Sequence, residues 1–174
     1  IGFGALCNRV FWRVVGEYIG IDEALGIMLN ETYPSFAALL KNGATTLWEG
    51  FEYFDGDMAH VPAEIPQGFW SFNHHFWGDI SAFWYRYLAG IRIDEPGKVN
   101  FAPLFSERVK SVRAEHIFAQ GMLRVEICRG GNTAHCKIFV PRGISVRVTP
   151  PEGWISNVPE LVCGENEVVF TKRV

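Results

Sequence analysis

Two short segments hold the residues best suited to chemistry. The first is Gly43-Ala44-Thr45-Thr46-Leu47-Trp48-Glu49, which places a carboxylate beside a tryptophan directly after the expected end of a helix. The second is Ser71-Phe72-Asn73-His74-His75-Phe76-Trp77-Gly78. Between residues 45 and 90 lie 13 of the 25 aromatic residues of the chain. Aromatic faces pack against the C–H faces of sugars while polar side chains bind the hydroxyls, so the pattern favours a sugar site, or one half of one.

Glu49 is the candidate for catalysis. A carboxylate that holds a water beside a sugar can act as the general base of an inverting glycoside hydrolase, in which two carboxylates lie about 6.5–9.5 Å apart. A non-catalytic role for Glu49 stays open, because a lone Glu after a Trp is more often a surface or capping residue. An Asn-His-His run is likewise more often an ordinary loop. Trp48, Asn73 and His74 are the candidates for substrate binding.

Other chemistries have weaker signals. A metal site could be built from His60, His74, His75, Asp55 and Asp57, but their spacing is not diagnostic of any metal. The Asp55-Gly56-Asp57 run resembles the start of a calcium loop and lacks the later ligands. No nucleophile elbow, phosphate loop or dinucleotide fingerprint occurs. We therefore predict no metal and no cofactor.

Composition narrows the partners. The chain has 174 residues, of which 48% are hydrophobic and 20% charged, an ordinary globular balance. The net charge is −3 without a Lys/Arg cluster, which argues against a nucleic-acid partner. The apolar runs are far shorter than a membrane span, so no membrane partner is expected. The compartment stays open between periplasmic, secreted and cytoplasmic bacterial locations.

Charge and pattern both change near Asp94-Glu95-Pro96-Gly97. Residues 1–93 carry a net charge of −5, and residues 94–174 carry +2. This predicts two domains, residues 1–94 and 95–174. The opening Ile1-Gly2-Phe3-Gly4 has no initiator Met, so we expect a fragment of a longer protein.

The first part of the chain has helical periodicity. A helix is expected from about residue 4 to 19, ending near Gly20, and a second is expected to be capped by Asp22. A third short helix should start at Pro34 and end at Asn42-Gly43. A fourth should start at Asp79. The side chains expected to be buried are Phe3, Cys7, Val10, Phe11, Val14 and Tyr18 in the first helix, Leu25, Met28 and Leu29 in the second, Phe36, Leu39 and Leu40 in the third, and Ile80, Phe83, Trp84, Tyr87, Leu88 and Ile91 in the fourth.

The second part has the period-two alternation of strands. Turns separate the predicted strands, which are residues 109–114, 122–127, 134–140, 145–148 and 167–170. Their spacing favours a small antiparallel β-sandwich. Cys128 and Cys136 flank the Gly130-Gly131-Asn132 turn, where they could face each other or remain buried free thiols.

Four motifs in series resemble bacterial α-L-rhamnosidases, glycoside hydrolase family seventy-eight, over their C-terminal part. The match is strong over residues 4–95 and holds only in outline over the β region. Its motifs are Tyr33-Pro34-Ser35-Phe36, Gly43–Glu49, Ser71–His75 and Trp84-Tyr85-Arg86-Tyr87-Leu88-Ala89-Gly90-Ile91.

The resemblance implies a fold and a function. The fold would be the C-terminal helices of an (α/α)6 barrel followed by an antiparallel β-sandwich. The parent enzyme would be an inverting hydrolase that releases terminal α-L-rhamnose from a glycoside or polysaccharide. Glu49 would match the general base and His74 a contact to bound rhamnose. Trp48 and Asn73 would neighbour the site by position.

Departures from the family pattern limit this expectation. The family's general acid comes from earlier barrel helices, and nothing in this chain matches that acidic stretch. A base without its acid leaves the departing oxygen unprotonated, so the chain alone should be inactive. A surface of Phe83, Trp84 and Tyr87 is expected to be exposed, and to be covered by the rest of the barrel or by another copy. The alternatives are a non-catalytic carbohydrate-binding or structural module, and a six-hairpin-barrel hydrolase of another sugar.

Overall fold

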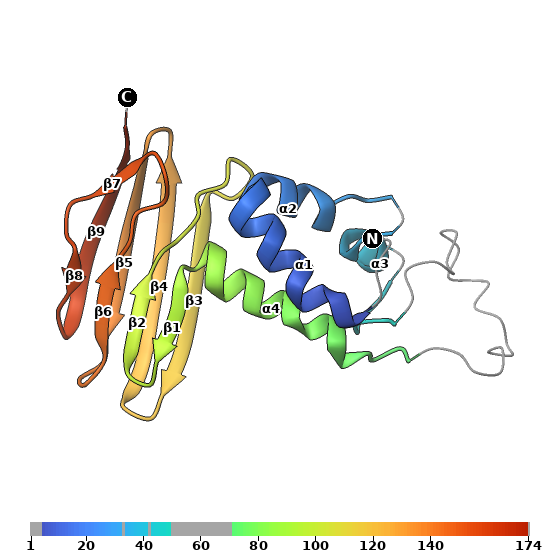
Figure 1. The fold of residues 1–174 in the computed structure, drawn as a ribbon, viewed down its shortest axis with the longest axis horizontal. Helices are drawn as coiled ribbons and strands as arrows, with labels where there is room; N and C mark the ends of the chain where they lie inside the picture. Colours follow the sequence, from blue (N-terminus) through green and yellow to red (C-terminus); the bar gives the residue numbers. More distant parts are fainter. Residues whose placement is uncertain (1–4, 33, 42, 50–70, 174) are drawn as a thin grey trace, which may run out of the picture. The chain divides into compact units, whose positions relative to one another are not determined.

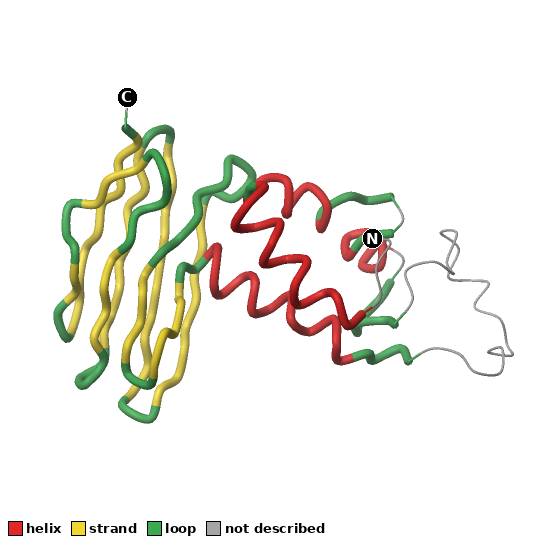
Figure 2. Tube along the Cα trace, viewed as in Figure 1, coloured by secondary structure: helices red, strands yellow, loops and turns green. Residues whose placement is uncertain are grey.

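The chain forms two compact units, Ile1–Ala82 and Phe83–Val174. The computed structural model describes residues 5–32, 34–41, 43–49 and 71–173. Figure 2 shows that the helices come first along the chain and the strands follow, which confirms the predicted order of a helical part and a β part. Within the described residues, no helix has the length and apolar character needed to cross a membrane.

The first helical stretch runs without a break from Ala5 to Ile19 (Figure 1). It consists of a 3-10 turn (η1, Ala5–Cys7), an α-helix (α1, Asn8–Val14) and a π turn (η2, Val15–Ile19). It ends at Gly20, whose φ of 150° suits glycine. The predicted length and end of this helix are therefore confirmed.

The predicted buried face of this helix is wrong. Val10, Val14 and Tyr18 are exposed in the chain, whereas Asn8 and Trp12 are fully buried. The reason is that Trp12 carries the largest apolar surface of the stretch, and its ring packs against that of Phe36 at 6.0 Å. Phe3 lies outside the described residues.

Two short helices follow. In α2 (Ile21–Met28), Leu25 and Met28 are buried as predicted, but the residue at the N-cap is Gly20 and not Asp22. In α3 (Phe36–Lys41), Leu39 is buried, whereas Leu40, expected inside, is exposed. The exposure of Leu40 follows from the short length of α3, which has room for one buried face.

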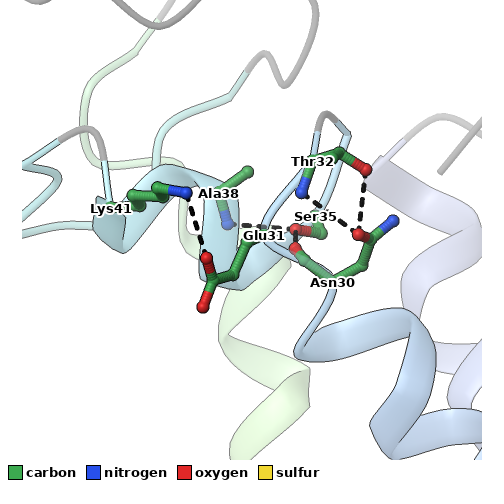
Figure 3. A network of polar contacts seen from close by, with 6 residues as sticks. All are labelled: Asn30, Glu31, Thr32, Ser35, Ala38 and Lys41. Atoms are coloured by element: carbon green, nitrogen blue, oxygen red, sulfur yellow. Dashed lines mark hydrogen bonds and ion pairs between the residues drawn. The ribbon is translucent and has the colours of Figure 1, made fainter.

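A polar network fixes the start of α3 (Figure 3). The Ser35 hydroxyl accepts a hydrogen bond from Ala38 N at 3.0 Å, as an N-cap does, and donates to Asn30 O. Thr32 donates to the Asn30 side chain from its main-chain N–H, at 3.1 Å, and from its hydroxyl, at 2.8 Å. Lys41 reaches back to Glu31 at 3.0 Å. These bonds close the connection between α2 and α3.

Gly43 ends α3 and turns the chain toward Glu49. Its φ is 82°, its N–H donates to Leu40 O at 3.0 Å, and Ala44 N–H donates to Leu39 O at 3.0 Å. A residue in the left-handed region is the usual end of a helix, so the predicted helix end is confirmed at Gly43. Asn42 lies outside the described residues.

The last helical stretch starts earlier and ends sooner than predicted. It comprises η4 (His75–Asp79), α4 (Ile80–Phe83) and η5 (Trp84–Leu88). Asp79 therefore lies inside the stretch and is not its cap. Ile91 belongs to the first strand, because Gly90, with φ of 71°, lets the chain leave the helix.

The predicted exposed surface of Phe83, Trp84 and Tyr87 is mostly wrong. Phe83 and Tyr87 are buried, and only Trp84 of the three is exposed, at 37%. The Tyr87 ring packs against Phe83 at 5.0 Å, and the Arg92 guanidinium lies 5.3 Å from its centroid. Packing within the unit Phe83–Val174 thus accounts for the burial of Tyr87.

Two sheets form the β part (Figure 1). The four-stranded sheet has the order β1-β2-β6-β8, and the five-stranded sheet has the order β3-β4-β5-β9-β7. All pairs are antiparallel except β2 and β6, which run parallel. The strands are β1 (Ile91–Glu95), β2 (Lys98–Phe101), β3 (Ser111–Phe118), β4 (Gly121–Gly130), β5 (Thr133–Val140), β6 (Ser145–Val148), β7 (Trp154–Ser156), β8 (Glu160–Leu161) and β9 (Gly164–Lys172).

One apolar core joins the two sheets. Phe101 of β2 and Phe170 of β9 lie within it, with ring centroids 6.0 Å apart. The alternation predicted for β4 is confirmed, since Leu123, Val125 and Ile127 are buried and the residues between them are exposed. Alternate side chains along the strands of both sheets are buried between the sheets, so the β part is a sandwich.

The cysteines are free. Cys136 pairs with Ile127 across the β4–β5 ladder, and Cys128 pairs with His135. Successive side chains of a strand point to opposite faces, so Cys136 is buried while Cys128 is exposed. The two thiols do not face each other, and only Cys136 fits the expectation of a buried free thiol.

Candidate active site

Two segments of the N-terminal unit lie side by side, the first ending at Glu49 and the second beginning at Ser71. The main-chain N–H of Glu49 donates to Ser71 O at 2.8 Å, and the N–H of His74 donates to Leu47 O at 2.6 Å. These bonds bring together Glu49 and His74, which are well separated in the sequence. The main chain thus assembles two of the four predicted site residues.

Glu49 is held through one carboxylate oxygen. Its Oε2 accepts a hydrogen bond from Ser71 N–H at 2.8 Å, and Nδ1 of His74 lies 3.6 Å from the same oxygen. The Glu49 side chain is 38% exposed and that of His74 18%. A carboxylate that is oriented by the main chain and open to water can accept a proton from a water molecule.

The contact between His74 and Glu49 depends on the protonation of the imidazole. At 3.6 Å it is longer than a normal hydrogen bond, so it is an ion pair only when the ring carries a proton. In the neutral state, the ring still limits the space on one side of Oε2.

Two buried tryptophans, Trp48 and Trp77, pack next to the candidate site. Trp77 is 3% exposed, and its Nε1 donates to Glu49 O at 3.1 Å. Trp48 is 6% exposed and belongs to the same apolar cluster, which also includes Leu39 and Ala44. The main chain of Glu49 is thus fixed by Trp77 on one side and by Ser71 on the other.

Exposed rings lie in the same segment as His74. Phe72 and Phe76 are 39% and 43% exposed, and His75 is exposed beside Phe76 at 4.4 Å between centroids. The ring of His74 lies edge-on to Phe76 at 5.1 Å. Rings that reach the surface beside a carboxylate give the mixture of apolar and polar contacts that a sugar requires.

The other two predicted binding residues have different surroundings. Trp48 is buried, and its ring meets Phe72 edge-on at 5.6 Å. Asn73 is exposed, and its main-chain N–H donates to Ser71 Oγ at 3.0 Å. Their roles toward a substrate stay predictions.

The predicted metal alternative combines five residues, of which the structure describes His74 and His75. His60, Asp55 and Asp57 lie outside the described residues. In the ranges that the structure does describe, no three His, Cys, Asp or Glu residues form a group suited to a metal ion.

Two residues of the site are missed by sequence reasoning. Ser71 acts through its main-chain N–H, which has no signature in the sequence. Asn8 is fully buried and donates to the main-chain carbonyls of Phe76 and Trp77. Its signal was available, because Asn8 and Trp12 stand one helical turn apart and form a matched acceptor and donor.

Comparison with known families and proteins gives a consistent result. The model of the bacterial α-L-rhamnosidase 6 hairpin glycosidase domain matches residues 1–88. An α-L-rhamnosidase of Alteromonas sp. (strain LOR) is 28% identical over 150 residues, which are 85% of this chain and 16% of that protein. One of Formosa agariphila is 29% identical over 103 residues, which are 58% of this chain and 11% of that protein. The chain thus spans a small part of the curated relatives it matches.

Solved structures show the same fold. The α-L-rhamnosidase of Dictyoglomus thermophilum has a TM-score of 0.79 at 23% identity, covering 99% of this chain and 21% of that one. The enzyme of Aspergillus terreus has a TM-score of 0.80 at 19% identity, covering 97% and 19%. That of Streptomyces avermitilis, complexed with L-rhamnose, has a TM-score of 0.75 at 21% identity, covering 98% and 17%.

Proposed function

The chain belongs to the bacterial α-L-rhamnosidase six-hairpin glycosidase family, and we propose that it carries the general base of an inverting α-L-rhamnosidase as part of a longer enzyme. The base is Glu49. The observation that carries the proposal is the Glu49 carboxylate, oriented at Oε2 by Ser71 N–H at 2.8 Å and open to water beside His74.

The reaction needs two carboxyl groups. In inverting hydrolysis, one protonates the departing oxygen, and the other takes a proton from the water that attacks the opposite face of the sugar ring. Glu49 serves the second role: its Oε2 is engaged by the main chain, and Oε1 accepts the proton. The water adds its oxygen to the anomeric carbon as the bond to the departing oxygen breaks.

The general acid lies outside this chain. Support comes from the length relation, since the chain spans 16% of the Alteromonas protein and 11% of the Formosa protein. Without an acid, the departing oxygen must leave as an alkoxide, which is far slower. The isolated chain is therefore inactive, and the longer protein that contains it is the hydrolase.

The substrate is a glycoside or polysaccharide with terminal α-L-rhamnose. Support comes from the relatives, which are named α-L-rhamnosidases, and from the structural neighbour complexed with L-rhamnose. His74 contacts the sugar through Nε2, while its Nδ1 faces Glu49. Asn73, which is exposed, contacts a hydroxyl, and the buried Trp48 supports the segment that ends in Glu49.

The rest of the barrel covers the exposed apolar face of the first helical stretch. In the described part of the chain, Leu6, Val10 and Tyr18 are 77%, 63% and 82% exposed. Contiguous apolar side chains on one helix face mark an interaction surface. The proposed division is then a barrel portion over residues 1–94 and a β-sandwich domain over residues 95–174, with β1 (Ile91–Glu95) spanning the boundary.

The experiment uses the full-length protein and an aryl α-L-rhamnoside. Glu49→Gln keeps the shape of the side chain and removes the base, so kcat should fall by about 10²–10⁴-fold. The matched control is Glu31→Gln, because Glu31 is an exposed carboxylate that forms an ion pair with Lys41. Turnover near the wild-type rate in Glu49→Gln would remove Glu49 from the reaction and favour a non-catalytic binding module.

A further inference from the structure

Asn8 is a fully buried polar side chain that the proposed reaction does not use directly. It is the first residue of α1. Its Oδ1 accepts a hydrogen bond from Trp12 Nε1, and its Nδ2 donates to Phe76 O at 3.2 Å and to Trp77 O at 3.5 Å. Burying an amide is costly unless both ends have partners, so this arrangement is a specific one.

The chemistry of the partners fixes the orientation of the amide. An indole N–H can only donate, so the group that faces Trp12 must be the Asn8 oxygen. Main-chain carbonyls can only accept, so the amino group must face Phe76 and Trp77. No other orientation of Asn8 satisfies all three contacts.

The two carbonyls belong to η4, which is joined to both candidate residues. The indole of Trp77 donates to Glu49 O at 3.1 Å. The main-chain N–H of Trp77 donates to His74 O at 3.2 Å. A continuous series of hydrogen bonds therefore runs from Asn8 through Trp77 to the main chain of both Glu49 and His74.

We propose that Asn8 is a positioning residue for Glu49 and His74, anchoring η4 to α1. The inference rests on the proposed function for its catalytic consequence, but the anchoring itself rests on the contacts of Asn8. Removing the anchor takes away the acceptor that faces the Trp12 indole and the donor to two carbonyls of η4, and η4 then shifts. A misplacement of about 1 Å of a reacting group costs about 10²-fold in rate.

Two variants of the full-length protein separate the roles of the amide. Asn8→Leu has a similar shape and removes all three contacts, and kcat should fall by about 10²-fold. Asn8→Asp keeps the oxygen that faces Trp12 and places a second oxygen against the carbonyls. Its activity relative to wild type should be low at neutral pH and should rise on acidification, because a protonated carboxyl can donate to a carbonyl.

Asn166→Leu is the matched control. Asn166 also bridges main-chain groups, since its Nδ2 donates to Val162 O at 2.7 Å and its Oδ1 accepts from Val162 N at 3.0 Å. It lies in the other unit of the chain. Asn166→Leu should lower stability while leaving kcat unchanged, so a general loss of stability cannot imitate the effect at Asn8.

A second readout does not depend on turnover. In the full-length protein, isotope-labelled at tryptophan and histidine, the NMR signals of the Trp77 indole N–H and the His74 ring should move in Asn8→Leu and stay in place in Asn166→Leu. If Glu49→Gln kept full activity, the proposed function would fail, yet these signals would still decide whether Asn8 anchors the site.

The results that overturn the inference are specific. A folded Asn8→Leu protein with wild-type kcat, or with unmoved Trp77 and His74 signals, contradicts the role of Asn8. If Asn8→Leu does not fold, Asn8→Asp decides: an activity ratio to wild type that does not rise on acidification also contradicts it.

Discussion

One main-chain group and one side chain of the candidate site approach the same oxygen atom. Ser71 N–H and His74 both approach Oε2 of Glu49, at 2.8 and 3.6 Å. The hydrogen bond from the main chain sets the plane of the carboxylate, and it does not change when a proton moves elsewhere in the site. The imidazole of His74 forms an ion pair with this oxygen only when the ring is protonated. Orientation and charge are thus supplied by different groups.

His74→Ala tests the second of these groups in the full-length protein. Loss of one hydrogen bond to the sugar should raise KM for an aryl α-L-rhamnoside by about tenfold, with a smaller change in kcat. His135→Ala is the control, because His135 is an exposed histidine of β5. Unchanged KM and kcat in His74→Ala would show that His74 does not touch the substrate.

Cys136 should differ from the other thiols in reactivity. Burial raises the pKa of the Cys136 thiol to about 12, so almost none of it is thiolate at pH 8. In the folded chain, a thiol reagent should label Cys7, Cys128 and Cys163, which are exposed, and should spare Cys136 until the chain unfolds. Mass spectrometry after brief labelling identifies the modified residues. Equal labelling of Cys136 and Cys128 would contradict the assignment.

The same pKa shift makes stability depend on pH. The folded chain keeps the Cys136 proton up to about pH 12, whereas the unfolded thiol loses its proton near its ordinary pKa. The unfolded state then binds fewer protons, so the Cys136 contribution to the free energy of unfolding falls as pH rises from about 9. Cys136→Val has no ionisable group and should lose less stability than wild type over this range.

At the scale of elements, α3 determines where the segment ending in Glu49 begins. Ser35→Ala removes the N-cap of α3, which is fully buried, and should cost about 1 kcal/mol. The amides of Ala38 and Leu39 should then exchange with solvent about fivefold faster. Thr32→Ala is the control, because Thr32 is exposed in the same network. Equal exchange rates in the two variants would mean that the cap does not hold α3.

Elements with a regular period could be predicted from the sequence, and irregular ones could not. The alternation of Leu123, Val125 and Ile127 predicts β4, because one face of that strand packs on a core. The strands β1, β2, β7 and β8 are missed. β7 and β8 have three and two residues, too few to display a period, and Ile91 at the start of β1 continues the apolar spacing of the preceding helix. The buried face of the first helix is predicted wrongly because Asn8 is polar. In the sequence it has the character of a surface residue, whereas in the fold it is a buried amide with three contacts.

The same distinction applies to the site. Residue types alone favour a sugar site at Glu49 and His74, and the four ordered motifs resemble those of α-L-rhamnosidases. The pairing of the two residues depends on Ser71 N–H and on Trp77, whose contacts are made to or by the main chain. Main-chain donors are the same in every residue except proline, so no sequence pattern could reveal them.

At the scale of the whole molecule, the chain has one apolar core in its β part and an incompletely covered helical part. The family match ends at Leu88, which is also the last residue of η5. Strands with their own core can stabilise the region after that point. The exposed side chains of the first helical stretch gain by burial against further helices, at about 1.5–3 kcal/mol for each fully covered side chain.

The last prediction concerns the division of catalysis between this chain and the rest of its protein. The 174-residue chain alone should release no sugar from an alkyl α-L-rhamnoside, since an alkoxide leaves slowly without a general acid and we propose that the acid lies outside the chain. The full-length protein should release rhamnose whose anomeric configuration is inverted, because water attacks the face opposite the departing group. Proton NMR in the first minutes of the reaction distinguishes the two anomers before they interconvert. Retained configuration would exclude Glu49 as a base in single displacement, and turnover by the chain alone would mean that it contains an acid as well.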